Sequence, residues 1–311
     1  MKIALCLSGQ PRTYKKCFKS IKKHLIDQWK IEDVFIHFWW DEKTNNQGNL
    51  ASWTYTSYVG DDEKKNYTPS KKKEPDLYSD LKKLYNPKLI RYDKPISNKL
   101  SKTPIPKFPN VEKLDYYNRK FLENKNMCFL EYPEEYQKFL HKHNKNMFKS
   151  QYLCSKLKRE HEKIIGQKYD IVIRTRFDVV FNDMVSFGCG GKLPPDLWEQ
   201  SANRGIGRFL PSLFQLKKDR WGYLSKKEKG IYMCVWDNFW IYTSEVHDLM
   251  MEELYINFEK NFWDEKKIKQ KSRNIGGGPW GTPETLQQFV MKKHQLKTVV
   301  PLAGEALSIL R

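Results

Sequence analysis

Two short apolar runs near the N-terminus, separated by a segment with helical spacing, limit most strongly what this chain can fold into. The runs cover residues 2–7 and 34–40, and the second is apolar on both faces except at His37. Between them, apolar residues recur at the spacing of an amphipathic helix: Tyr14, Cys17, Phe18, Ile21 and Leu25. This order predicts parallel strands joined by a right-handed crossover. We therefore expect an α/β fold with a doubly wound, mostly parallel sheet and helices on both faces.

The remaining segments alternate between helical and strand-like patterns. Helices are predicted over 76–84, over 147–165, from a cap at Ser244 to about Phe258, and after Thr282-Pro283. Strands are predicted over 88–92, 169–178 and 231–243, the last interrupted by Asp237-Asn238. Residues 43–75 are polar with little periodicity and are expected to form a surface excursion, and 182–230 are irregular and rich in glycine and proline.

The most charged strand end lies at residues 169–178, where an apolar run is followed by Arg174, Arg176 and Asp178. If the segment is extended throughout, these side chains share one face because they are two residues apart. Open α/β sheets bind ligands at the carboxyl ends of their strands, and converging charges are costly unless a ligand or counter-charge meets them. The pattern predicts arginines that hold a phosphate, with a divalent cation bridging it to Asp178. The alternative is a structural ion pair.

The first strand also ends in a polar turn, Ser8-Gly9-Gln10-Pro11-Arg12. A small residue and a glycine allow the backbone to approach a nucleotide, while Gln10 can bond to a base edge and Arg12 to a phosphate. An equally favoured interpretation is a tight turn whose arginine caps the next helix. Together, the two strand ends favour an enzyme that uses a phosphorylated donor.

Two further carboxylates are candidates for proton transfer. Asp237 lies between bulky aromatic residues, where a carboxylate is either paired or catalytic because isolating its charge is costly. Glu284 is expected in the first turn of a helix that follows a glycine-rich loop. It serves either an active site or the helix dipole.

The charge and the cysteines narrow the class of protein. The formal net charge of +19 would suit nucleic acid, a membrane surface or a polyanionic substrate. The surplus is mostly lysine spread over short runs, and charge alone is a weak signal, so we expect no nucleic-acid partner. The six cysteines lack CxxC spacing, which favours free buried thiols in a reducing compartment. No run approaches the roughly 20 apolar residues of a membrane helix, so a cytoplasmic protein without a transmembrane segment is expected.

Several common motifs are absent. The turn after the first predicted strand has a single glycine and no GxGxxG, which disfavours dinucleotide binding. The chain has no Walker A, HExxH or GxSxG sequence, which disfavours a P-loop phosphotransferase, a zinc protease and a hydrolase of the nucleophile-elbow type.

Five short segments, taken in order, resemble one family of enzymes. They are Leu7-Ser-Gly-Gln-Pro-Arg12, Asp33-Val-Phe-Ile-His-Phe-Trp-Trp-Asp41, Tyr169-Asp-Ile-Val-Ile-Arg-Thr-Arg-Phe-Asp178, Asp237-Asn-Phe239, and Pro283-Glu284 followed by His294-Gln-Leu296. Together they span nearly the whole chain and resemble glycosyltransferases of bacterial surface-polysaccharide clusters and of large DNA viruses. For a viral protein, the compartment would be the host cytoplasm.

The resemblance implies a single GT-A-like domain, a UDP- or GDP-linked sugar donor, and transfer of the sugar to a glycan hydroxyl. Residues 1–181 would form the nucleotide-sugar-binding half, and 182–311 the acceptor-binding half. In this family an Asp-x-Asp motif ends a strand and holds Mn²⁺ or Mg²⁺ against the diphosphate. Here the triplet is Arg176-Phe177-Asp178, so the first carboxylate is missing. Either Asp178 alone holds the cation, or the arginines replace it.

These expectations assign a role to each candidate residue. The metal is expected at Asp178, and the base at Asp237 or, failing that, Glu284. Loops 43–75 and 272–281 are expected to act as lids. Donor binding is expected at Ser8, Gly9, Gln10, Arg12, Arg174 and Arg176. The alternative function is a noncatalytic, basic carbohydrate- or nucleic-acid-binding protein, which explains the charge but not the placement of the carboxylates.

Overall fold

A computed structural model describes most of the predicted elements. The described residues are 2–11, 14–27, 29–40, 74–94, 134–181, 230–235, 239–264, 283–301 and 307–309. Arg12, Asp237 and the loop 272–281 lie outside them, as do residues 182–229 of the expected irregular segment. The expected excursion at 43–75 lies outside them up to residue 73, and its last two residues begin a helix.

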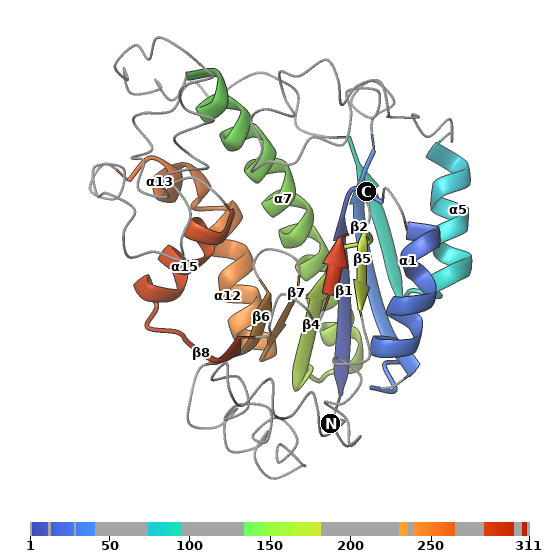
Figure 1. Ribbon diagram of the computed structural model, residues 1–311. Helices are drawn as coiled ribbons and strands as arrows, with labels where there is room; N and C mark the ends of the chain where they lie inside the picture. Colours follow the sequence, from blue (N-terminus) through green and yellow to red (C-terminus); the bar gives the residue numbers. More distant parts are fainter. Residues whose placement is uncertain are drawn as a thin grey trace, which may run out of the picture.

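The strands of the described residues form one large and one small sheet. Their bounds are β1 Ile3–Gly9, β2 Asp33–Trp39, β3 Leu89–Asp93, β4 Ile171–Thr175, β5 Val179–Phe181, β6 Gly230–Val235, β7 Phe239–Tyr242, β8 Lys297–Pro301 and β9 Leu307–Ile309. Seven of them form a sheet in the order β3-β2-β1-β4-β7-β6-β8 (Figure 1). Strands β3, β2, β1 and β4 are parallel, β7 is antiparallel to both of its neighbours, and β8 is parallel to β6. Strands β5 and β9 pair separately.

Helices lie on both faces of the large sheet (Figure 1). One face carries α1 (Tyr14–Ile21), continued by the π-helical segment η1 (Lys22–Asp27), and α5 (Glu74–Tyr85). The other face carries α7 (Glu134–Ile165) and α12 (Ser244–Tyr255). Two further helices, α13 (Phe258–Phe262) and α15 (Pro283–Lys293), pack against α12. The predicted α/β fold with a mostly parallel sheet flanked by helices is therefore confirmed.

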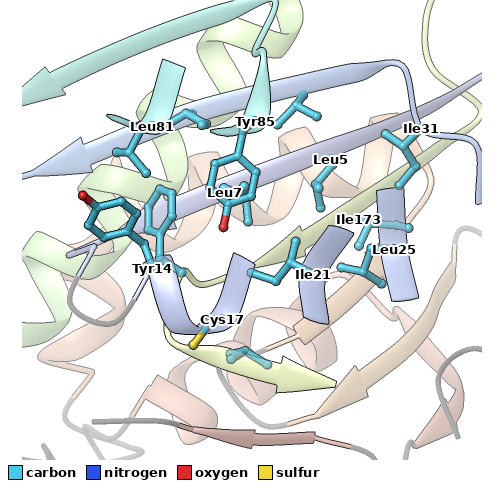
Figure 2. Close-up of a cluster of buried hydrophobic side chains, with 14 of the residues drawn as sticks. Leu5, Leu7, Tyr14, Cys17, Ile21, Leu25, Ile31, Leu81, Tyr85 and Ile173 are labelled. Carbon is cyan, nitrogen blue, oxygen red and sulfur yellow. The ribbon is translucent and has the colours of Figure 1, made fainter. Parts of the chain in front are cut away.

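The alternation of side chains along the strands explains the two helical layers. Leu5 and Leu7 of β1 pack in the hydrophobic core beneath α1 and α5 (Figure 2). Ala4 and Cys6 of the same strand pack in a second core that includes Leu157 of α7. Successive side chains of a strand point to opposite faces, so a strand that is apolar on both faces needs a helix on each. Cys6, Cys17 and Cys154 are buried free thiols, as expected.

Three local predictions differ from the structure. The helix predicted from residue 147 begins at Glu134, and in its added N-terminal part His141 and Lys145 both bind Glu259 of α13. The strand predicted over 231–243 is a pair of antiparallel strands, β6 and β7. The N-cap of α12 is Thr243, whose hydroxyl accepts from the Val246 amide, rather than Ser244.

Among the described residues, every helix is too short or too polar to span a bilayer.

Candidate functional site

The strand order reverses beside β1. From β1 the chain adds β2 and then β3 on one side, and afterwards returns through α7 to place β4 on the other side. The helices of these connections lie on opposite faces of the sheet (Figure 1). The carboxyl ends of β1 and β4 therefore flank a topological switch point, which is where open α/β sheets bind ligands.

The register of β1 and β4 brings the two predicted polar segments together. Cys6 is paired with Arg174, and Leu7 with Thr175. The end of β1 and the residues after it, which we call the β1 turn (residues 8–11), thus lie next to the end of β4. The register brings Ser8 and Gly9 to the same carboxyl edge of the sheet as Arg174 and Arg176, which flank Thr175.

Arg176 and Asp178 form a bidentate ion pair. Arg176 donates from Nε to Oδ1 of Asp178 at 2.9 Å and from Nη2 to Oδ2 at 2.7 Å. The Asp178 residue is 1 % exposed, whereas 23 % of the Arg176 side chain is exposed. Two parallel N–H···O bonds hold a guanidinium in a defined plane. Asp178 therefore orients Arg176 at the sheet edge.

The predicted single face over residues 174–178 is wrong. Strand β4 ends at Thr175, and Phe177 and Asp178 form a turn before β5 begins at Val179. The two-residue alternation therefore stops at Thr175, and the turn folds Asp178 back onto Arg176. Strand β5 leaves the large sheet because it pairs with β9.

Arg174 lies beneath the edge of the sheet. It is 1 % exposed and is paired in register with Cys6 of β1 and Trp240 of β7. Its side chain therefore points to the face that α7 and α12 cover. Burial lowers the pKa of His247 on α12, and the positive charge of Arg174 acts in the same direction. Arg174 thus adds positive potential from within the fold.

The β1 turn is bonded to α7 through Ser150. The Gly9 amide donates to Ser150 Oγ at 3.0 Å, and Ser150 Oγ also lies 2.9 Å from both the carbonyl oxygen and Nδ1 of His37. Gly9 has a φ of 112°, which residues with a side chain rarely adopt, and a Cβ placed on it would meet nothing within 4 Å. The backbone at Gly9 is therefore open to close approach. Ser8 is buried beside its register partner His37.

His37 connects Ser150 to a carboxylate. Its Nε2 lies 3.6 Å from Oδ2 of Asp93, which Lys149 Nζ also approaches to 3.2 Å. Burial lowers the pKa of His37 to about 4, and the raising effect of Asp93 does not compensate. The ring is therefore neutral near pH 7. Ser150 donates its one hydroxyl hydrogen to the His37 carbonyl oxygen, so the neutral ring donates to Ser150 Oγ from Nδ1.

Glu284 lies on helix α15, not on one of the strand ends. It is half-buried in the first turn of α15, which packs against α12 and α13. The other predicted base, Asp237, falls between β6 and β7, outside the described residues. Arg12 falls between the β1 turn and α1, also outside them.

The structure bears on metal binding only through its described residues. No cluster of three or more His, Cys, Asp or Glu side chains within them could hold a metal ion. Both carboxylate oxygens of Asp178 accept from Arg176, so a cation at Asp178 would lie next to the positive guanidinium.

Sequence reasoning did not identify Ser150, Asp93 and Lys149 as part of this region. One signal was present: His37 is the polar exception in an apolar run, and a buried imidazole requires partners. Nothing local indicated which residues they would be, since Ser150 is 113 positions away along the chain.

Comparison with known proteins finds no matching family model, no similar curated protein and no similar solved structure.

Proposed function

We propose that the protein is a glycosyltransferase of the GT-A type that takes a sugar from a UDP- or GDP-linked donor and transfers it to a hydroxyl of a glycan acceptor. One observation carries the proposal. The β1 turn and the Arg176–Asp178 pair lie side by side at the carboxyl ends of neighbouring parallel strands, where the strand order reverses.

In this proposal the nucleotide lies over the β1 turn. The open space at Gly9 allows it to approach the backbone, Gln10 bonds to the base, and Arg12 binds phosphate. Arg176 binds the diphosphate, because its side chain is partly exposed and its guanidinium is held in plane by Asp178. Positive charge placed there in advance stabilises the leaving diphosphate as the glycosidic bond breaks. Arg174 adds positive electrostatic potential from the face of the sheet that α7 and α12 cover.

We further propose that the arginines supply the charge that a cation provides in enzymes with the Asp-x-Asp motif. Mn²⁺ or Mg²⁺ at Asp178 would lie next to the positive guanidinium of Arg176. We therefore expect nucleotide binding to persist when divalent cations are removed. Asp237, or failing that Glu284, is the proposed base that accepts the proton of the acceptor hydroxyl.

The net charge of +19 favours a second candidate, a noncatalytic basic protein that binds carbohydrate or nucleic acid. The two candidates differ in what stabilises the folded chain. A transferase is stabilised by nucleoside diphosphates, whereas a nucleic-acid binder shows salt-sensitive binding to RNA or DNA.

The test is a thermal-shift titration of the full chain with UDP and with GDP, each in the presence of Mn²⁺ or of EDTA. We expect one nucleotide to raise the melting temperature by several degrees with or without the cation. Arg176→Gln should weaken that nucleotide's binding about ten- to hundredfold, because bonds between charged groups are lost.

Arg91→Gln is the matched control. Arg91 also makes a two-bonded pair with a carboxylate, Glu160, but on an exposed part of β3. Its loss should leave nucleotide affinity unchanged. If no nucleotide stabilises the wild-type chain and salt-sensitive RNA or DNA binding is seen, the transferase proposal is wrong.

A further inference from the structure

Three elements meet at the hydroxyl of Ser150. The residue is 1 % exposed on α7, and its Oγ contacts Gly9 of β1 and His37 of β2. The His37 ring in turn faces Asp93 of β3. The carboxyl ends of two parallel strands are thus bonded to one helix through the Ser150 side chain, and a third strand is reached through His37.

Ser150 Oγ both accepts and donates hydrogen bonds. It accepts from the Gly9 amide and donates its one hydrogen to the His37 carbonyl oxygen, so the neutral His37 ring donates to it from Nδ1. On the other side of the ring, Nε2 lies 3.6 Å from Oδ2 of Asp93. Lys149, from the same helix, approaches that carboxylate as well. Polar networks of this kind restrict a buried region when each member has a partner.

Ser150 does not have the environment of a catalytic nucleophile, although Ser, His and Asp recur together in hydrolases. Its Oγ is buried and already accepts the Gly9 amide. The effect of the network therefore falls on the backbone of the β1 turn. Gly9 has a φ of 112°, which glycine adopts at no steric cost, so the bond from its amide to Ser150 selects this conformation among those open to it.

We propose that Ser150 is a positioning residue that holds the β1 turn in the conformation that receives the nucleotide. The Gly9 amide is committed to Ser150 and does not bind phosphate. Its role is to orient the peptide that leads to Gln10. The inference deepens the proposed function, on which its statement about the nucleotide rests, while the bond between Gly9 and Ser150 can be tested without any ligand.

The first measurement is amide hydrogen exchange in the ligand-free full chain labelled with [¹⁵N]glycine, which gives 16 glycine signals. In Ser150→Ala, the Gly9 amide should exchange at least about tenfold faster than in the wild type, since its acceptor is gone. Ser155→Ala is the matched control. Ser155 is another fully buried serine of α7, but its hydroxyl donates to Asp248 of α12 at 2.7 Å. It should leave Gly9 exchange unchanged.

The second measurement is the dissociation constant of UDP and GDP for the same three proteins by calorimetry. We expect Ser150→Ala to bind the preferred nucleotide about tenfold more weakly, and Ser155→Ala to bind it within about twofold of the wild type. If Ser150→Ala does not fold, Ser150→Cys replaces it, because sulfur fills the site but is a weak acceptor.

The outcomes separate the two ideas. Unchanged Gly9 exchange in the Ser150 variant overturns the positioning role, whatever the nucleotide result. Equal loss of affinity in the Ser150 and Ser155 variants also overturns it, since a general loss of stability would then suffice. A wild-type chain that binds neither nucleotide overturns the proposed function, and with it the role of the turn in binding. Faster Gly9 exchange with selectively weakened binding supports both.

Discussion

At the scale of single residues, His37 shows what burial does to a titratable group in an apolar strand. Its ring is buried under α7, and burial is the largest influence on its pKa, which falls to about 4. Asp93 opposes this shift, but 43 % of its side chain is exposed and water screens its charge. Lys149 and Arg91 add positive charge nearby and lower the pKa further.

The shift of His37 predicts a dependence of stability on pH. Between its ordinary pKa of 6.5 and the folded value of about 4, the unfolded chain binds more protons, so stability falls as the pH is lowered through this range. From pH 7 to pH 5, the wild type should lose roughly 2 kcal/mol more in free energy of unfolding than His37→Asn. Asparagine keeps a polar atom near the position of Nδ1 but does not titrate. The measurement is urea unfolding at both pH values.

His247 provides the background for that comparison. Its pKa is also lowered by burial, so it contributes to the pH dependence of both proteins. The difference between the two proteins therefore reports His37 alone. Equal losses in both would mean that His37 titrates normally in the folded state.

At the scale of elements, α7 connects the sheet to the C-terminal helices. It has 32 residues and is about 48 Å long, roughly twice the length of a seven-residue strand. Its C-terminal half packs on the sheet through residues such as Cys154 and Leu157. Its N-terminal half packs on α13, where the His141 ring lies parallel to Trp263 at 5.5 Å. The same helix thus carries Ser150 and contacts both halves of the chain.

The contact between α7 and α12 depends on a buried cation. Lys158 is fully buried, and its Nζ contacts Glu162 at 2.8 Å and Asp248 at 3.2 Å. Glu162 also accepts from the Ser244 hydroxyl and from the Tyr169 amide, and Ser155 donates to Asp248. Each buried charge therefore has partners, which is the condition for tolerating it.

Removing that cation should be severely destabilising. Lys158→Met leaves two carboxylates without their positive partner, and we expect a loss of about 3–5 kcal/mol in the free energy of unfolding by urea. Lys168→Met is the control, because Lys168 pairs with Glu245 at an exposed position and should cost at most about 1 kcal/mol. Similar losses in the two variants would show that the buried network contributes little.

At the scale of the whole molecule, the two halves of the sequence share one sheet. Strand β7 pairs with β4, and Trp240 of β7 lies beside Arg174. Phe148 of α7 packs in one hydrophobic cluster with residues of β7, α12, α13 and α15. The C-terminal half thus covers both an edge strand and an apolar face that residues 1–181 would otherwise expose.

This arrangement predicts that residues 1–181 do not fold as a separate unit. In that fragment the edge of β4 would be unpaired and the apolar face of α7 uncovered, a combination that favours aggregation over a cooperative fold. We expect the fragment to show no sigmoidal urea transition by circular dichroism, while the full chain shows one that coincides with its tryptophan fluorescence. A cooperative transition in the isolated fragment would show that the halves are independent domains.

The sequence by itself determined many of the segments that become strands and helices, above all in the first half of the sheet. Residues 2–7 and 34–40 are apolar on both faces, so their burial between two helical layers followed directly, and the helix after the β1 turn was visible from its spacing. The placement of charge after residue 173 also pointed correctly to the carboxyl edge of the sheet. These properties are local, because hydrophobic periodicity records which face of an element is buried.

Only the tertiary structure decided what each buried face meets. The turn that folds Asp178 onto Arg176 accompanies the pairing of β5 with β9, a strand from the far end of the chain. The N-terminal half of α7 contacts α13, where His141 and Lys145 bind Glu259, a partner 114 positions or more away along the chain. Ser150 meets Gly9 and His37 only because β1 and β2 lie together under α7. Periodicity indicates that a face is buried but does not name its partner, because partners distant in sequence are chosen by the packing of the whole fold.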